Sequence, residues 1–158
     1  MALTTDGEVW TWGSNTYGEL GNAIESIYID EPKRITSLED IVDIGAGNYH
    51  AVAVDKNGNV YTWGLNVNGQ LGTGDTTDVK SPVKINGLSG IVKVDAYKNT
   101  TTALDADGNL FEQTFYNDDN IIVHRDIYEG ENSNSLGVLL FQGNKKAFFS
   151  GDMNNITS

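Results

Sequence analysis

The stretch "VWTWGSNTYGELG" (Val9–Gly21) occurs a second time, with few changes, as "VYTWGLNVNGQLG" (Val60–Gly72). A tryptophan, three glycines, an asparagine and a leucine return at a spacing of 51 residues. The recurring residues are Trp12, Gly13, Asn15, Gly18, Leu20 and Gly21, and their counterparts are Trp63, Gly64, Asn66, Gly69, Leu71 and Gly72. A fixed period in this range indicates a repeat architecture.

The repeat extends on both sides of the quoted phrase. Residues 40–63 align with residues 90–113 at a spacing of 50, and Leu3 corresponds to Val54, so the first copy is short at its front. We therefore divide residues 1–115 into three propeller-type repeats, followed by a β-strand tail. The divisions are 1–39 (a truncated first repeat), 40–89 (the second), 90–115 (a degenerate third) and 116–158 (the tail).

Each repeat is predicted to consist of β-strands. The segments "IVDIG", "HAVAV" and "NVYTW" are short and rich in β-branched and aromatic residues. The turns "TTDG", "DKNG" and "DADG" suit tight hairpins. About 50 residues hold four short strands, and such units repeated radially form a propeller. We expect an all-β chain, namely a partial β-propeller of about two and a half blades plus a C-terminal β-hairpin region. A β-sandwich is the competing architecture.

Composition narrows the function classes. The formal net charge of −12 disfavours nucleic acid and anionic membranes as partners. No signal peptide or transmembrane segment is visible in this chain, and the absence of cysteine leaves no thiolate or disulfide chemistry. These features leave the compartment undetermined.

The segment "GAGNYHAVAVDKNGNVYTWGLNVNGQLGTGDTTDVKSPVKI" resembles the repeat of the regulator-of-chromosome-condensation superfamily of seven-bladed propellers. The resemblance covers about residues 2–114. Gly64, Gly69 and Gly72 would permit turn conformations at the blade rim. Trp63 and the equivalent Trp12 would fill the gap between neighbouring blades. The superfamily includes nucleotide-exchange factors for small GTPases, but no exchange-loop residues can be matched here.

A second resemblance concerns residues 131–155, "ENSNSLGVLLFQGNKKAFFSGDMNN". This segment is similar to a strand-turn-strand of competence-type metallo-β-lactamase-fold hydrolases, in which the aspartate of the Gly-Asp pair binds metal. That resemblance makes Asp152 a candidate metal ligand. A dinuclear hydrolase site needs several imidazoles, whereas this chain has only His50 and His124 and no H-x-H-x-D-H motif.

The remaining polar motifs favour structural roles. His50, at the start of "HAVAV", is expected to tie its blade together through a backbone hydrogen bond, and His124 to face outward from a strand. Asp55 and Asp105 resemble calcium-loop residues, but the glycine spacing is that of hairpin turns. We predict no catalytic or cofactor-binding residue and no cofactor.

The sequence thus predicts a non-catalytic repeat scaffold that binds a protein partner. A closed seven-bladed ring at this period needs on the order of 350 residues, so we expect a fragment of a larger protein or self-association that completes the propeller. The alternative is an accessory module of a metallo-β-lactamase-fold hydrolase whose catalytic segment lies outside this chain.

Overall fold

The computed structural model describes residues 1–113, 123–126, 128–129, 136–142 and 145–149, with side chains as far as Phe111. All regular elements in these residues are β-strands, which confirms the all-β prediction. No helix of the described part is long and apolar enough to cross a membrane.

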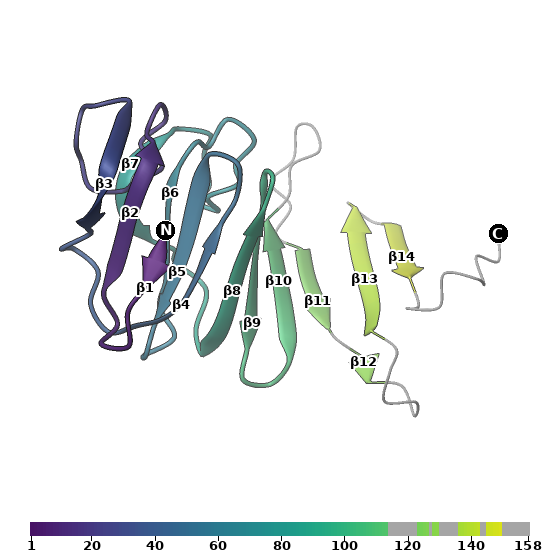
Figure 1. Cartoon of the computed structure of the whole chain (residues 1–158). Helices are drawn as coiled ribbons and strands as arrows, with labels where there is room; N and C mark the ends of the chain where they lie inside the picture. The colour runs from purple at the N-terminus through teal and green to yellow at the C-terminus, as the bar shows by residue number, and fades with distance from the viewer. Residues whose placement is uncertain (114–122, 127, 130–135, 143–144, 150–158) are drawn as a thin grey trace.

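The strands form four antiparallel sheets (Figure 1). Blade 1 contains β1 (Ala2–Leu3), β2 (Val9–Ser14) and β3 (Tyr28–Arg34). Blade 2 contains β4 (Ile41–Ala46), β5 (His50–Asp55), β6 (Val60–Gly64) and β7 (Val79–Lys84). Blade 3 contains β8 (Ile91–Tyr97), β9 (Thr100–Asp105), β10 (Asn109–Gln113) and β11 (Val123–Asp126). The fourth sheet contains β12 (Tyr128–Glu129), β13 (Leu136–Gln142) and β14 (Lys145–Phe149).

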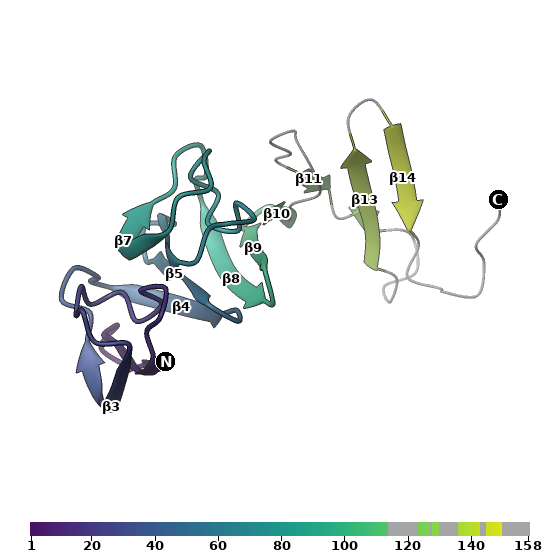
Figure 2. The same cartoon turned by 90° about the horizontal axis from the view of Figure 1, so that it is seen from above.

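The first three sheets follow one another in chain order, and Figure 2 shows them from above. β4 and β8, each the first strand of its sheet, lie side by side. The outermost strand of blade 3, β11, comes from residues after 115 and pairs with β10. In the tail, β13 and β14 pair from Val138↔Phe149 to Gln142↔Lys145, which confirms the predicted hairpin as a pair of strands. The exact division between repeats stays a prediction.

The hydrophobic core lies between the sheets rather than within one. β5 is buried along its whole length because its two faces contact different blades. Successive side chains of a strand point to opposite faces, so the valines of "HAVAV" pack toward blade 3 and its alanines toward blade 1. The blade 2–3 cluster is Val52, Val54, Val60, Ile85, Ile91, Val94, Ala96 and Ala103. The blade 1–2 cluster is Val9, Ile35, Leu38, Ile41, Ala51, Ala53 and Trp63.

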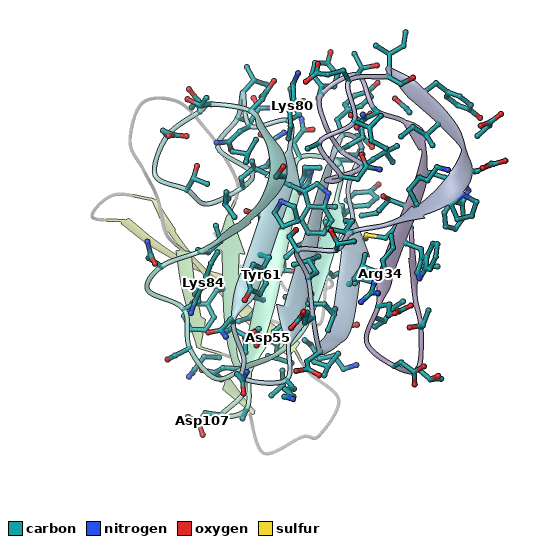
Figure 3. All side chains as sticks on the ribbon, turned by 90° about the vertical axis from the view of Figure 1, so that its left-hand side faces the viewer. Arg34, Asp55, Tyr61, Lys80, Lys84 and Asp107 are labelled. Carbon is teal, nitrogen blue, oxygen red and sulfur yellow. The ribbon has the colours of Figure 1, made fainter. Side chains whose placement is uncertain are left out.

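The predicted hairpin turns are present, and their aspartates bond to the turn itself. Asp55 Oδ1 accepts the backbone N–H groups of Asn57 and Asn59, both at 2.9 Å, and Oδ2 accepts the Tyr61 hydroxyl at 3.2 Å (Figure 3). Burial alone would raise the pKa of Asp55, but hydrogen bonds outweigh it and lower the pKa, first among them the bond that the Asn59 side-chain amide donates to Oδ2 at 2.7 Å. The carboxylate therefore stabilises the turn that Gly58 closes at φ +77°.

The two equivalent tryptophans have different environments. Trp63 is fully buried, and its indole Nε1 donates to the Glu19 carbonyl of blade 1 at 2.9 Å. A Cβ on Gly21 would lie 2.6 Å from that Nε1, so only glycine leaves room for the ring. Trp12 is 42% exposed. Trp12 fills no gap between the described blades, because no described blade precedes blade 1, and its predicted role stays a prediction.

This difference predicts unequal effects of the same truncation. Trp63→Ala should lower the free energy of unfolding by about 3–5 kcal/mol, the usual cost of removing a large buried aromatic side chain. Trp12→Ala serves as the matched control and should cost about 1 kcal/mol or less, since much of its ring already contacts water. Urea unfolding of both variants checks this, and equal losses would contradict the packing described.

Candidate functional site: the loop end of the blades

One end of the blades carries the long connections and is here called the loop end. It consists of residues 15–27, 47–49, 65–78 and 98–99, which join the strands at the upper side of Figure 1. Neighbouring connections contact one another across the blades. The Asn48 N–H donates to the Lys98 carbonyl at 2.9 Å, and the Tyr17 and Tyr49 rings meet edge to face at 5.1 Å. The loops of successive blades thus form one continuous surface.

A buried asparagine organises each long loop. Asn66 is fully buried; its Oδ1 accepts the Leu71 N–H at 3.0 Å and its Nδ2 donates to the Asp75 carbonyl at 3.0 Å. Asn15 accepts the Leu20 N–H in the same way, at 3.1 Å. A buried amide with all these partners fixes the loop backbone, because any other loop shape would leave polar groups unpaired. Sequence analysis missed this role, although the recurrence of asparagine in "WGxN" was a signal for it.

The Glu or Gln of the repeated phrase closes the turn before it. Glu19 Oε2 accepts the Tyr17 N–H at 2.7 Å, and Gln70 Oε1 accepts the Asn68 N–H at 2.9 Å. This shared geometry explains why the position tolerates either residue. Positive φ angles confirm the predicted turn conformations at Gly64 (+105°), Gly69 (+68°) and Gly72 (+70°).

His50 belongs to a buried hydrogen-bond chain that joins blades 2 and 3. The Thr101 hydroxyl donates to the Gln70 carbonyl at 2.7 Å, so it accepts from His50 Nε2 at 2.9 Å. Burial lowers the pKa of His50 to about 4, and an interaction with the Thr100 backbone opposes this only partly. His50 is thus a neutral structural residue, as expected, although its main link runs through a threonine hydroxyl.

Two other candidate residues come from the part of the chain after residue 115. His124 lies in β11 opposite Phe111 in the strand register, and its side chain is outside the described part. Asp152 also lies outside the described residues. Within the part of the chain that the structure describes, no group of three or more His, Asp or Glu residues could hold a metal ion.

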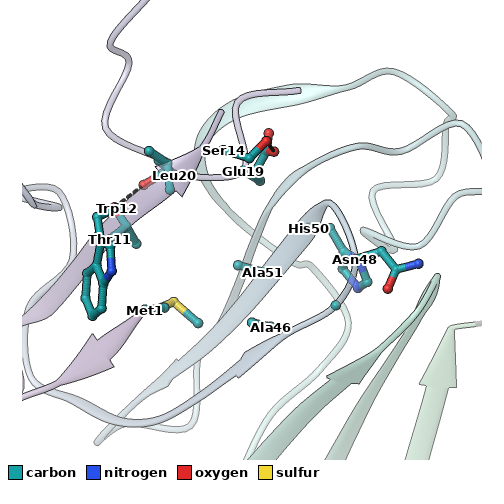
Figure 4. Close-up of a pocket in the computed structure, with 11 residues that line it drawn as sticks. Met1, Thr11, Trp12, Ser14, Glu19, Leu20, Ala46, Asn48, His50 and Ala51 are labelled. Atoms are coloured by element: carbon teal, nitrogen blue, oxygen red, sulfur yellow. Dashed lines mark hydrogen bonds between the residues drawn. The ribbon is translucent and has the colours of Figure 1, made fainter. Parts of the chain in front are cut away.

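A groove of about 170 Å³ lies between blades 1 and 2, near the loop end. In Figure 4, Met1 lies between Thr11 and Trp12 of β2 on one side and Ala46 and Ala51 of blade 2 on the other. The groove holds no cluster of titratable groups, and its only histidine, His50, is committed to the chain described above.

The exposed side chains of the loop end are those expected of a protein-binding surface. Val67 is 62% exposed in the loop fixed by the buried Asn66. Tyr49 is 43% exposed, and Tyr97, the last residue of β8 beside the turn 98–99, is 69% exposed. Asp75 and Asp78 are exposed beside them. Large side chains on a preorganised backbone lose little conformational freedom on binding, which favours association.

Comparison with family models shows what kind of repeat this is. The model of the regulator of chromosome condensation (RCC1) repeat matches residues 6–54 and 57–104, which together make up more than half of the chain. A second model of the same repeat matches residues 41–70. The matched unit 6–54 contains β2–β5, so the sequence repeat begins in one blade and ends in the next. Nothing in the comparisons supports a likeness of residues 131–155 to metallo-hydrolases.

Curated proteins and solved structures agree with this match. The chain is 36% identical over 115 residues to the human probable E3 ubiquitin-protein ligase HERC3 and 41% identical over 116 residues to the Protein RCC2 homolog of Danio rerio. Each alignment covers 70% of this chain, but it spans only 11% and 23% of those proteins.

Among solved structures, human WBSCR16 matches with a TM-score of 0.63 at 29% identity, over 71% of this chain and 30% of its own. A chain in the structure of Kap60 bound to yeast RCC1 (Prp20) matches with a TM-score of 0.69 at 20% identity, over 87% and 37%. At that identity the second likeness concerns the fold alone. The chain is thus an all-β partial propeller, as predicted.

The buried His50 predicts an acid-sensitive link between blades 2 and 3. Its folded-state pKa lies below the unfolded value of 6.5, so its stabilising effect is present above pH 6.5 and is lost as the pH falls toward 4. Between pH 7.5 and 4.5 the wild-type chain should lose on the order of 2 kcal/mol more stability than His50→Gln, which cannot titrate. Urea unfolding at both pH values measures this, and parallel losses would refute it.

Proposed function

Because the chain belongs to the family of proteins built from regulator of chromosome condensation (RCC1) repeats, we propose that it is a non-catalytic module that binds another protein through its loop end. The observation that carries this proposal is the exposure of Val67 in the loop fixed by Asn66, together with that of Tyr49 and of Tyr97, the last residue of β8. Tyr49 and Tyr97 flank the turns that the bond from the Asn48 N–H to the Lys98 carbonyl joins. Binding residues typically occupy loops that a rigid scaffold positions.

The distribution of polar groups supports a binding role over a catalytic one. The motif residues that could serve in chemistry are engaged inside the blades: His50 with Thr101, and Asp55 with its own turn. The exposed residues of the loop end include the aromatic Tyr49, the aliphatic Val67 and the acidic Asp75. Tyrosine is enriched at interfaces because it combines a large contact area with a polar end.

The net charge indicates the kind of surface that the partner presents. With a formal charge of −12, this chain attracts proteins that are basic at their contact surface and repels nucleic acid. Solved relatives give precedents for protein partners. One structure shows Kap60 bound to yeast RCC1 (Prp20), and another study of Prp20p concerns its binding to Gsp1p and histones. Their partners are not carried over to this chain individually.

The test compares two surfaces of the same molecule. The full chain is used to capture interacting proteins, and the captured set is compared with that of a loop-end variant carrying Tyr49→Ser, Val67→Ser and Tyr97→Ser. Specific partners should bind the variant at least about tenfold more weakly, because truncating interface aromatics costs on the order of 2 kcal/mol.

The matched control for this test is Val42→Ser with Val92→Ser. These side chains are 50% and 43% exposed on β4 and β8, outside the loop end. The control variant should retain the captured proteins. Capture that survives the loop-end variant, or that is lost equally in the control, would place the interaction elsewhere and overturn the proposal.

The alternative of an accessory module of a metallo-hydrolase depends on residues 131–155 alone. If that segment is only a hairpin, Asp152 lacks imidazole partners, and a lone carboxylate holds a divalent cation weakly. The purified chain should then carry no stoichiometric zinc or manganese, and Asp152→Ala should change stability by about 0.5 kcal/mol or less. Elemental analysis that finds a tightly held metal, lost in Asp152→Ala, would favour the hydrolase alternative.

A further inference from the structure

The chain contains an asparagine followed by glycine at three places, namely Asn57–Gly58, Asn68–Gly69 and Asn86–Gly87. Asparagine is a chemically labile residue. The backbone nitrogen of the next residue can attack its side-chain Cγ, so that a C–N bond closes a succinimide ring and ammonia leaves. Water then opens the ring at either carbonyl and leaves aspartate or isoaspartate. A following glycine favours the attack, because it has no Cβ that would obstruct the nitrogen.

Hydrogen bonds hold two of these pairs in place. The Gly58 N–H donates to the Asp55 carbonyl at 2.9 Å, and the Gly69 N–H donates to the Asn66 carbonyl at 2.7 Å. Both glycines are buried. The N–H of the preceding asparagine is held as well, by the Asp55 carboxylate in one pair and by the Gln70 side-chain amide in the other. The attacking nitrogen of each pair is thus engaged elsewhere.

The third pair, Asn86–Gly87, lies in the connection between β7 and β8 and is exposed. Among the described residues, no hydrogen bond holds the Gly87 N–H. A Cβ on Gly87 would have no neighbour within 4 Å, whereas a Cβ on Gly58 would lie 2.8 Å from the Ile91 backbone nitrogen. Open space around the peptide leaves the Gly87 nitrogen able to turn toward the Asn86 side chain.

We propose that Asn86 is a modification site, which converts to aspartate and isoaspartate ahead of Asn57 and Asn68 with water as the co-reactant. The fold sets this order rather than the local sequence. Ile85 precedes Asn86, and a β-branched neighbour restricts the rotation that ring closure needs, so the sequence around Asn86 gives it no advantage. Either product carries a carboxylate that is ionised at neutral pH, which adds one negative charge to the chain.

Isoaspartate at this position changes the contact between blades 2 and 3. It lengthens the main chain by one carbon atom between Ile85 and Leu88. Ile85 belongs to the buried blade 2–3 cluster, and Leu88 packs against that cluster. The Ile85 N–H also donates to the Val60 carbonyl at 2.8 Å. Because a close-packed core accommodates a displaced side chain poorly, the modification loosens this interface as the protein ages.

The equivalent connection between blades 1 and 2 cannot react in this way. Ile35 and Leu38 are buried at the corresponding positions, but Thr36 and Ser37 stand between them. The Leu38 N–H also donates to the Ile35 carbonyl at 3.4 Å. The change is therefore confined to one interface between blades. Since residues 85–90 lie outside the loop end, this inference does not rest on the proposed function.

The test incubates the full chain at mildly alkaline pH, folded and in parallel in urea, and measures conversion at each asparagine by peptide mapping and mass spectrometry. In the folded chain Asn86 should convert at least about tenfold faster than Asn57 and Asn68, because those sites must first break hydrogen bonds. In urea the three rates should become similar. Asn86→Gln should remove the fast conversion, and the matched control Asn57→Gln should leave it unchanged.

Urea unfolding of aged samples tests the effect on the blades. Aged wild-type chain should unfold at lower urea than aged Asn86→Gln, which keeps its main chain intact. Asn86→Asp carries the new charge on a normal main chain and should be as stable as fresh wild type.

Three results would overturn the proposal. The first is conversion of Asn57 or Asn68 as fast as that of Asn86 in the folded chain. The second is a preference for Asn86 that persists in urea, since the local sequence would then set the order. The third is equal stability of aged wild type and aged Asn86→Gln after conversion, which would remove the link to the blade 2–3 interface.

Discussion

The insertion of the Trp63 indole beneath residues 19–21 couples blades 1 and 2, and the rest of the fold depends on this contact. The ring is fully buried, its Nε1 bonds to the Glu19 carbonyl, and Gly21 leaves the necessary space. The repeated phrase contains both halves of such an interface, because its tryptophan faces the preceding blade and its glycine loop the following one. Blades built this way pack one after another in chain order. The stability of each blade comes largely from its contacts with the neighbouring blades.

Buried polar side chains fix the conformation of the loops at one end of the blades. Asn15 and Asn66 bond the backbones of their loops, and the His50–Thr101–Gln70 chain joins blades 2 and 3. Burying such groups without partners is costly, so these bonds specify one loop conformation. His50 and Asp55, whose residue types often take part in catalysis, form structural hydrogen bonds here. In our proposal, the exposed side chains of the loop end are the ones that bind a partner.

The first and the third blade differ in their number of described strands. Blade 3 completes four strands by pairing β11 with β10, although the sequence between them no longer follows the repeat. Blade 1 has three strands and an exposed Trp12. Among the described residues, the position of blade 1 that corresponds to β4 has no strand.

The sequence by itself determined the strands, their order and the hairpin turns, because these depend on local patterns such as alternating apolar residues and the Asp55–Gly58 turn. It also identified the repeated phrase and, with it, the family. Only the tertiary structure decided that Trp63 is buried while Trp12 is exposed, that Asn66 holds its loop, and that β11 completes blade 3. The physical reason is that burial and strand pairing depend on which segments lie opposite one another in space. Equivalent tryptophans in the two copies therefore have different environments, since Trp63 has a described blade on both sides and Trp12 does not.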